Sequence, residues 1–287
     1  MEIDYFIAGT QKSGTTSLQH LLSLSSELQT HRSLEFTYFS IDFEQKKGER
    51  FLRRYYFSNK KSKKKRLAKH STACYNINEI KLAVKSNPQI NFILIFRNPV
   101  YRSFSSYLME YSRNQYSKTF EEAIRIGMNE IHSFEHRVFL HYGLYDTMLE
   151  QLYREISKEQ IHIVLFEEFM NAPVETANRI LNELHLEPIS HTNKKIHNGY
   201  KIPRNHLIGL FYKSLRYSKI KTPIKLMFTG NVWNYVAKTM YKLSFKKAKT
   251  YPQLSIEMEK ILFDYYYDSM VNFEKITGIH TNWLQKN

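Results

Sequence analysis

The chain has 287 residues, of which 42% are hydrophobic and 15% aromatic, so it is long and apolar enough for one large domain with a buried core. Its single cysteine, Cys74, excludes an internal disulfide framework and a cysteine-based metal cluster. The formal net charge of +15 favours a polyanionic partner over a basic one.

The first predicted elements are a strand over residues 3–8 and a helix over residues 14–25, joined by a tight loop with Gly9 and Gly14 five positions apart. This order of strand, glycine-containing loop and helix is typical of a phosphate-binding loop. Backbone amides at the start of a helix have no partners inside the helix, and the helix dipole adds positive charge there. The segment therefore predicts an anion site.

The loop departs from the nucleotide-hydrolase signature in a way that limits its ligand. That signature places a lysine directly after its second glycine, but Thr15 follows Gly14 here and the lysine stands earlier, at Lys12. Such a loop fits a nucleotide with a shorter 5′ chain and no essential metal. The residues predicted to contact the anion are Lys12, Ser13, Gly14, Thr15, Thr16 and Ser17.

A second segment predicts another anion contact. After helices at 46–57 and 76–86 and a strand near 70–74, the apolar run 91–96 is predicted to be a buried parallel strand. It ends at Arg97, at the carboxyl edge of the sheet, where open α/β sheets place ligands. Arg97 can bind a phosphate through two parallel hydrogen bonds. Ser105, on the helix predicted over 99–115, can reach the same anion.

The remaining elements complete an alternating pattern, which predicts a parallel sheet with right-handed crossovers in one domain over residues 1–287. Within it, residues 188–287 form a basic, helical subregion. Apolar stripes with intervening lysines in 204–250 are typical of a helix packed on the core or lying on a membrane. The other predicted elements are helices at 119–130, 132–141, 144–157, 173–185 and 254–275 and a strand at 161–165.

Together the two anion segments resemble the sulfotransferase family. Its 5′-phosphosulfate loop reads P-K-S/G-G-T-T/S-x-L, and residues 11–18 read Q-K-S-G-T-T-S-L. Its 3′-phosphate motif reads R-[DN]-P-x-x-R-x-x-S-x-Y, and residues 97–107 read R-N-P-V-Y-R-S-F-S-S-Y. The resemblance implies a P-loop-like three-layer fold, a central parallel sheet flanked by helices. It also implies the donor 3′-phosphoadenylyl sulfate (PAPS), the product 3′,5′-ADP and no metal.

The resemblance also implies roles for single residues. Lys12 resembles the lysine at the bridging oxygen of the phosphosulfate, and Arg97 and Ser105 resemble the pair that binds the ribose 3′-phosphate. Residues 35–40 resemble the K-E-x-x-[FY]-F segment of carbohydrate sulfotransferases of the heparan-sulfate type, which makes Glu35 the expected catalytic base. The segment ending in Arg204 resembles N-x-x-x-x-P-R of bacterial members, so we expect Arg204 to contact the donor.

The function predicted first is sulfuryl transfer from PAPS to a hydroxyl or amine of a polysaccharide or glycolipid. One alternative is a small-molecule sulfotransferase with a histidine base. A P-loop kinase and a non-enzymatic polyanion-binding module are further alternatives, but the kinase requires a lysine after Gly14 and the module leaves the loop unexplained. The candidate histidines for the small-molecule alternative are His31, His70, His136 and His197.

The uneven distribution of charge suggests a polyanionic partner. Residues 46–66 contain 11 lysines and arginines and one acid, and residues 188–256 contain 14 and no acid. Such one-sign segments suggest a polyanionic partner, which can be the donor nucleotide, an acidic glycan, an anionic membrane or a nucleic acid. With the motifs, the resemblance implies a glycan or glycolipid acceptor, which can be anionic, with peripheral contact to an anionic membrane as a further expectation and a nucleic acid not expected. Because the sequence shows no signal peptide and no 18-residue apolar run, we expect a cytoplasmic bacterial protein.

Overall fold

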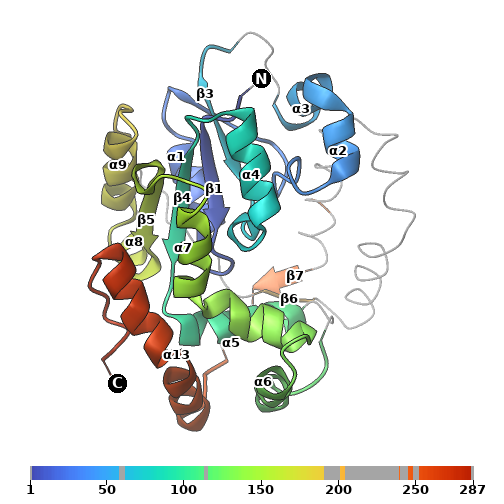
Figure 1. Ribbon diagram of the computed structural model, residues 1–287, viewed down its shortest axis with the longest axis vertical. Helices are drawn as coiled ribbons and strands as arrows, with labels where there is room; N and C mark the ends of the chain where they lie inside the picture. The colour runs from blue at the N-terminus through green and yellow to red at the C-terminus, as the bar shows by residue number, and fades with distance from the viewer. Residues whose placement is uncertain are drawn as a thin grey trace.

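The protein is built on a five-stranded sheet in which every paired strand is parallel, in the order β2-β3-β1-β4-β5 (Figure 1). The computed structural model describes residues 2–57, 62–112, 116–190, 201–203, 239, 245–247 and 252–285. The predicted α/β fold with a central parallel sheet is confirmed. The strands are β1 (Tyr5–Gly9), β2 (Leu28–Thr30), β3 (Lys65–Lys69), β4 (Asn91–Phe96) and β5 (Ile161–Leu165).

The two faces of the sheet belong to two separate hydrophobic cores. Successive side chains of a strand point to opposite faces, so on β1 Phe6 joins one core and Ile7 the other. On β4, Leu94 and Ile95 alternate in the same way. Because both faces are buried, these strands read as continuous apolar runs, which is why the sequence revealed them.

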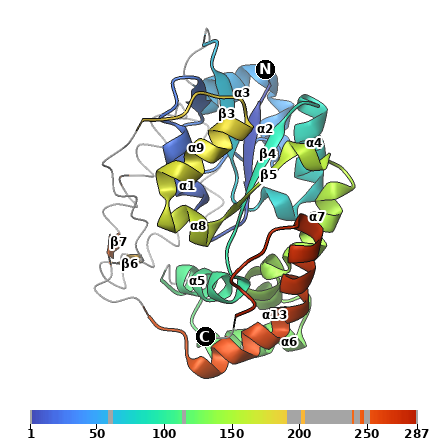
Figure 2. The ribbon, with the colours of Figure 1, turned by 90° about the vertical axis from the view of Figure 1, so that its left-hand side faces the viewer.

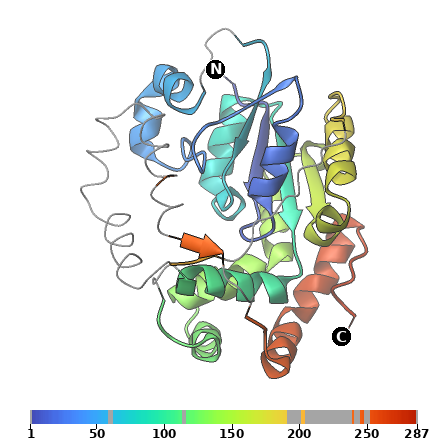
Figure 3. The ribbon, with the colours of Figure 1, turned by 180° about the vertical axis from the view of Figure 1, so that it is seen from behind.

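Helices cover both faces of the sheet. Helices α1 and α9 pack on one face (Figure 3), and α4 and α7 pack on the other (Figure 1). At the lower end of the molecule in Figure 2, α5, α6 and α13 pack together. The helices are α1 (Thr15–Leu22), α2 (Asp42–Lys46), α3 (Gly48–Tyr56), α4 (Ile77–Ser86), α5 (Pro99–Ser112), α6 (Phe120–Asn129), α7 (Tyr145–Tyr153), α8 (Phe166–Asn171), α9 (Pro173–Glu183) and α13 (Ile256–Thr277).

The connections bring three loops together at the carboxyl ends of the strands. The chain passes from β1 through α1 to the edge strand β2, returns to β3, and then crosses β1 through α4 to reach β4. The strand order therefore reverses around β1, and open α/β sheets bind ligands outside the carboxyl ends of their strands at such a point. The loops that follow β1, β3 and β4 meet there.

Three predicted elements differ from the structure. The strand expected near 70–74 is β3, which ends at Lys69, and residues 73–75 form a 3₁₀ turn, η1 (Ala73–Tyr75). The helix expected over 46–57 begins two residues later, as α3, where Gly48 has a φ of 66°, and the short helix α2 before it was not predicted. In place of a helix over 132–141, the chain forms a π-helix, η2 (His136–Leu140), followed by the 3₁₀ turn η3 (His141–Gly143).

The C-terminal subregion is described only in part. Strands β6 (Lys201–Pro203) and β7 (Phe245–Lys247) pair antiparallel, which the prediction of a helical subregion did not include. The terminal helix predicted over 254–275 is confirmed as α13. Apart from residue 239, the rest of 191–250, including most of the predicted basic stripes, lies outside the described residues. Within the described part of the chain, no helix combines the length and the hydrophobicity needed to span a membrane.

Candidate active site

The loop after β1 is fixed to the neighbouring strand β4. The amide and the hydroxyl of Thr10 both donate to the carbonyl of Ile95, at 2.9 Å and 2.7 Å. The Thr10 and Ser13 hydroxyl oxygens are 2.8 Å apart, and the Ser13 amide donates to the Thr10 carbonyl at 3.4 Å. These bonds hold the loop tightly over the carboxyl ends of two adjacent strands.

The loop then turns directly into α1. Gly14, the N-cap of this helix, has a φ of 89°, which a residue with a Cβ rarely adopts. The first helical residues, Thr15 and Thr16, have no carbonyl four positions back inside the helix, so their amides face outward beyond its N-terminus. Thr16 is exposed, whereas Thr15 and Ser17 are buried. The geometry is that of an anion-binding helix start.

Lys12 and Arg97 bring the two predicted motifs into contact. Arg97 lies directly after β4, and its Nη1 donates to the Lys12 carbonyl at 3.3 Å. The guanidinium also lies over the Phe166 ring, 4.6 Å from its centroid. Lys12 is half-buried and has a φ of 73°. Residues 85 positions apart therefore form one basic site.

Helix α5 carries the rest of the second motif. Ser105 is half-buried, and its neighbour Ser106 donates to Gln11 Oε1 at 3.3 Å, which ties α5 to the first loop. Arg102 has a structural role, since it is fully buried. Its guanidinium donates to the carbonyls of Val138 and Phe139, at 3.1 Å and 2.5 Å. Arg102 thus anchors η2 and does not reach the anion site.

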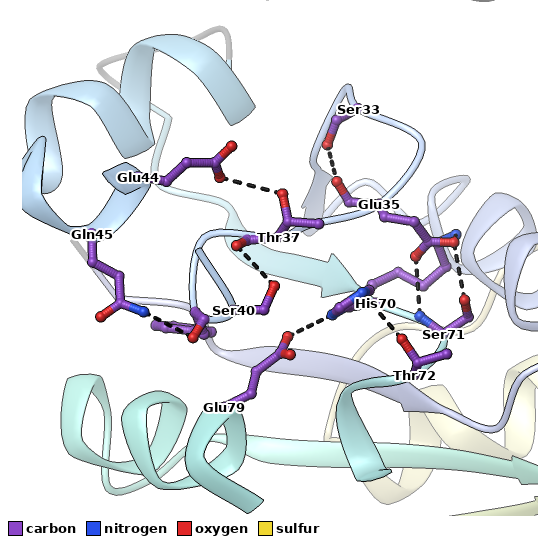
Figure 4. A network of polar contacts seen from close by, with 12 residues as sticks. Ser33, Glu35, Thr37, Ser40, Glu44, Gln45, His70, Ser71, Thr72 and Glu79 are labelled. Atoms are coloured by element: carbon purple, nitrogen blue, oxygen red, sulfur yellow. Dashed lines mark hydrogen bonds and ion pairs between the residues drawn. The ribbon is translucent and has the colours of Figure 1, made fainter. Parts of the chain in front are cut away.

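Glu35 lies beside the loop, at the end of β3 (Figure 4). Its Oε1 is 2.9 Å from Lys69 Nζ and accepts from the Ser71 hydroxyl at 3.1 Å. Its Oε2 accepts from the Ser71 amide at 3.0 Å. An ionised carboxylate offers about four acceptor positions. Among the described residues Oε2 has this one donor, so a position remains for the hydroxyl or amine of a substrate.

Sequence reasoning missed Lys69. Its side chain is 1% exposed, and its Nζ lies between Glu35 and the Thr16 hydroxyl, at 2.9 Å and 3.4 Å. Lys69 thus connects the predicted base to the predicted donor loop. The available signal was a lysine at the end of the short apolar stretch Leu67–Ala68, and placing the strand at 70–74 concealed it.

His70 points away from this cluster. Because His70 follows Lys69 directly, its side chain leaves the opposite face of the chain, toward α4. There its Nδ1 is 2.6 Å from the Glu79 carboxylate, and its Nε2 is 3.3 Å from the Thr72 hydroxyl (Figure 4). A carboxylate that orients an imidazole is the arrangement found around many histidine bases. His70 is therefore the second candidate base.

The other histidine candidates have weaker positions. His136 Nδ1 is 2.8 Å from the Gly127 carbonyl, away from both loops. His197 and Arg204 lie outside the described residues. Burial lowers the pKa of His31 to about 3, and the nearby charge of Lys69 acts in the same direction. His31 is thus neutral at physiological pH. Among the described residues, no group of three or more His, Cys, Asp or Glu side chains could hold a metal ion.

The low pKa of His31 predicts a loss of stability in acid. The folded protein binds fewer protons than the unfolded chain between pH 6.5, the ordinary pKa, and about pH 3. The contribution of His31 to the free energy of unfolding is therefore fully present above pH 6.5 and is lost as the pH drops. Between pH 7 and pH 5 the loss from this residue is about 2 kcal/mol. Urea unfolding at both pH values should show this difference shrinking in His31→Asn. The exposed control His132→Asn should leave the difference unchanged, and an equal change in both variants would contradict the assignment.

The chain is similar to known proteins in sequence and in fold. The sequence matches the model of the sulfotransferase family over residues 48–190, a range that contains Arg97 and Ser105. No curated protein matches the sequence. The structure is similar to a sulfotransferase from Alicyclobacillus acidocaldarius, at 15% identity and a TM-score of 0.65, over 99% of this chain and 100% of that one.

Two further solved structures are less similar. A mouse sulfotransferase in complex with PAP is 17% identical, with a TM-score of 0.46 over 66% of this chain and 60% of that one. Retinol dehydratase in complex with androsterone and PAP is 14% identical, with a TM-score of 0.48 over 97% of this chain and 82% of that one.

The similarity to the Alicyclobacillus acidocaldarius sulfotransferase shows a shared fold, and the family model covers about half of the chain. The protein therefore belongs to the sulfotransferase family of enzymes.

Proposed function

We propose that this protein, as one domain over residues 1–287, transfers a sulfuryl group from PAPS to a hydroxyl or amine of a carbohydrate acceptor. The observation that carries the proposal is the contact of Arg97 Nη1 with the Lys12 carbonyl, 3.3 Å away. It unites a loop suited to a 5′-phosphosulfate with an arginine suited to a 3′-phosphate. A nucleotide with an anionic group at each end of its ribose fits both.

The donor is recognised at two points. The amides of the loop and of the α1 N-terminus, with the hydroxyls of Thr15, Thr16 and Ser17, receive the 5′-phosphate. Arg97 and Ser105 receive the 3′-phosphate and so discriminate against ATP, which has no phosphate at that position. Arg204 is the further donor contact that the sequence motif proposes.

The chemistry is an in-line displacement at sulfur. Glu35 takes the proton from the acceptor hydroxyl or amine at Oε2, which has a single donor among the described residues. The acceptor oxygen or nitrogen bonds to sulfur as the bond from sulfur to the bridging phosphate oxygen breaks, which leaves 3′,5′-ADP. Negative charge grows on the bridging oxygen, and Lys12 and the loop amides stabilise it. Lys69 holds Glu35 toward the loop through its contacts with both.

The choice of a carbohydrate acceptor rests on the Glu35 segment and on surface charge. Helix α3 buries Leu52 and Tyr56 and carries basic side chains on its other side. Lys63, Lys64 and Lys65, just before and at the start of β3, are exposed as well. Such a surface attracts acidic sugars. A small phenol or alcohol is the second candidate acceptor, favoured by the His70–Glu79 pair.

Product analysis tests the acceptor class. The protein would be incubated with ³⁵S-labelled PAPS and three sets of acceptors, namely acidic polysaccharides, neutral glycans or glycolipids, and small phenols and alcohols. We expect label in carbohydrate, with acidic polysaccharides preferred. Label confined to phenols or alcohols would contradict the carbohydrate proposal while leaving the donor assignment intact.

Arg97→Ala tests the donor assignment. Because a charge-assisted fork to phosphate is lost, binding of 3′,5′-ADP should weaken by about 2–4 kcal/mol. Binding of 5′-AMP, which lacks the 3′-phosphate, should change far less. Isothermal titration calorimetry measures both, with the exposed Arg125→Ala on α6 as the matched control. Equal losses for the two nucleotides would mean that Arg97 only supports the fold.

A further inference from the structure

The C-terminal segment lies against the loop that carries Arg97. Helix α13 ends at Thr277, and Gly278, with a φ of 70°, turns the chain. The Thr281 amide and hydroxyl then both donate to Glu274 Oε1, at 2.6 Å and 2.8 Å. Although burial acts to raise the pKa of Glu274, these bonds hold it below its usual range. The turn is thus fixed, and it places Trp283 with 2% exposure.

Glu167 joins Trp283 to the loop after β4, which carries Arg97 and Asn98. It is the second residue of α8, the helix that follows β5 directly. Its Oε2 accepts from Trp283 Nε1 at 3.3 Å, and its Oε1 accepts from the Asn98 amide at 3.0 Å. Asn98 is the neighbour of Arg97, and its own Oδ1 accepts from the Val100 amide at 3.0 Å, which caps α5. One carboxylate therefore connects the end of the chain to the start of the phosphate-binding motif.

A second connection reaches Arg97 itself. The Tyr145 hydroxyl donates to the Arg97 carbonyl at 2.9 Å. Burial raises the pKa of Tyr145 to about 12, so the hydroxyl keeps its proton and can donate. The Tyr145 ring lies 5.9 Å from Trp283 and 4.9 Å from Phe96, the last residue of β4. Phe273 of α13 completes the cluster, 5.0 Å from Trp283.

These contacts fix the backbone on both sides of the bond between Arg97 and Asn98. An arginine that recognises a phosphate through two parallel bonds needs a fixed orientation. The hydrogen bonds of the Arg97 carbonyl and the Asn98 amide supply this fixed orientation. The carboxylate of Glu167 stays aligned because Trp283 donates to its other oxygen. The phosphate-binding arginine thus depends on a residue 186 positions away in the chain.

We propose that the C-terminal segment is part of the donor site, with Trp283 and Glu167 as positioning residues that set the affinity for the 3′-phosphate through Arg97. The proposal rests on the proposed function for the identity of the ligand. It requires no contact between Trp283 and the nucleotide. Trp283 and Glu167 are therefore expected to affect binding of the nucleotide and not proton transfer from the acceptor, because neither residue contacts Glu35 or Lys69.

The test compares Trp283→Phe and Glu167→Gln with the wild-type protein. Phenylalanine keeps a ring in the aromatic cluster and removes the N–H donor. We expect binding of 3′,5′-ADP to weaken by about tenfold in each variant, the effect of one lost hydrogen bond to a charged group. Binding of 5′-AMP should stay within about twofold. The matched control is Tyr267→Phe, on the exposed side of α13.

Hydrogen exchange at the Asn98 amide provides a readout without any ligand. Exchange there should be faster in both variants than in the wild type and the control. Unchanged exchange together with unchanged 3′,5′-ADP binding would overturn the proposal, as would equal losses for the two nucleotides. If the wild type fails to bind 3′,5′-ADP, the proposed function fails, and the Asn98 exchange rate still decides whether the C-terminal segment holds the loop.

Discussion

Replacing Lys12 with alanine is expected to lower the rate of sulfuryl transfer by about 10²–10³. The reason is electrostatic, because the transition state places negative charge on the bridging oxygen and Lys12 is the loop residue with a full positive charge. The fold should survive, since Lys12 is half-buried in a loop and belongs to neither hydrophobic core. Initial rates at saturating PAPS, with melting temperatures measured alongside, test this.

The matched control for Lys12→Ala is Lys85→Ala, which removes an exposed lysine near the end of α4. Both variants should melt within a degree or two of the wild type, and the control should keep wild-type turnover. Near-normal turnover in Lys12→Ala would mean that the loop does not receive the phosphosulfate.

Replacing Glu35 with glutamine is expected to lower turnover on the true acceptor by about 10²–10⁴. Glutamine keeps the shape and still offers an acceptor to Lys69, but it cannot take a proton. The affinity for 3′,5′-ADP should be almost unchanged, so the loss should appear in kcat. Calorimetry with the nucleotide and the free energy of unfolding separate this effect from damage to the buried ammonium of Lys69.

The controls for Glu35→Gln are substitutions of the second candidate base, His70, and of its partner, Glu79. His70→Ala and Glu79→Gln remove the pair that faces α4, and we expect them to lower turnover much less than Glu35→Gln. The reverse result, with turnover lost in His70→Ala and kept in Glu35→Gln, would identify histidine as the base. It would also weaken the carbohydrate proposal, because a histidine base is expected of small-molecule members.

The central strands could be predicted because burial on both faces leaves a simple signal. Strands β1 and β4 are continuous apolar runs, and each is followed by residues of a predicted phosphate-binding motif. Strand β2 has three residues, Leu28–Thr30, and no sequence pattern stands out at that length. Strand β3 carries lysines at both ends, so its sequence resembles a surface segment although Lys69 is buried.

The parts that sequence reasoning missed depend on partners far away in the chain. Arg102 and Tyr266 both donate to the carbonyl of Phe139, and this carbonyl lies within η2, the segment predicted as an ordinary helix. Glu35 was predicted from its motif, but Lys69, 34 positions later, connects it to the loop. Glu167 and Trp283 are 116 positions apart. Local periodicity carries no information about such pairs.

Ligand-dependent melting tests the central claim most directly, because binding to the folded state stabilises it by mass action. We expect 3′,5′-ADP at 100 times its Kd to add about 2.7 kcal/mol to stability and raise Tm by several degrees. ATP with Mg²⁺, at the same concentration, should raise it much less. A larger rise with ATP and Mg²⁺ than with 3′,5′-ADP would contradict a donor site built on Lys12 and Arg97 for a 3′-phosphorylated nucleotide.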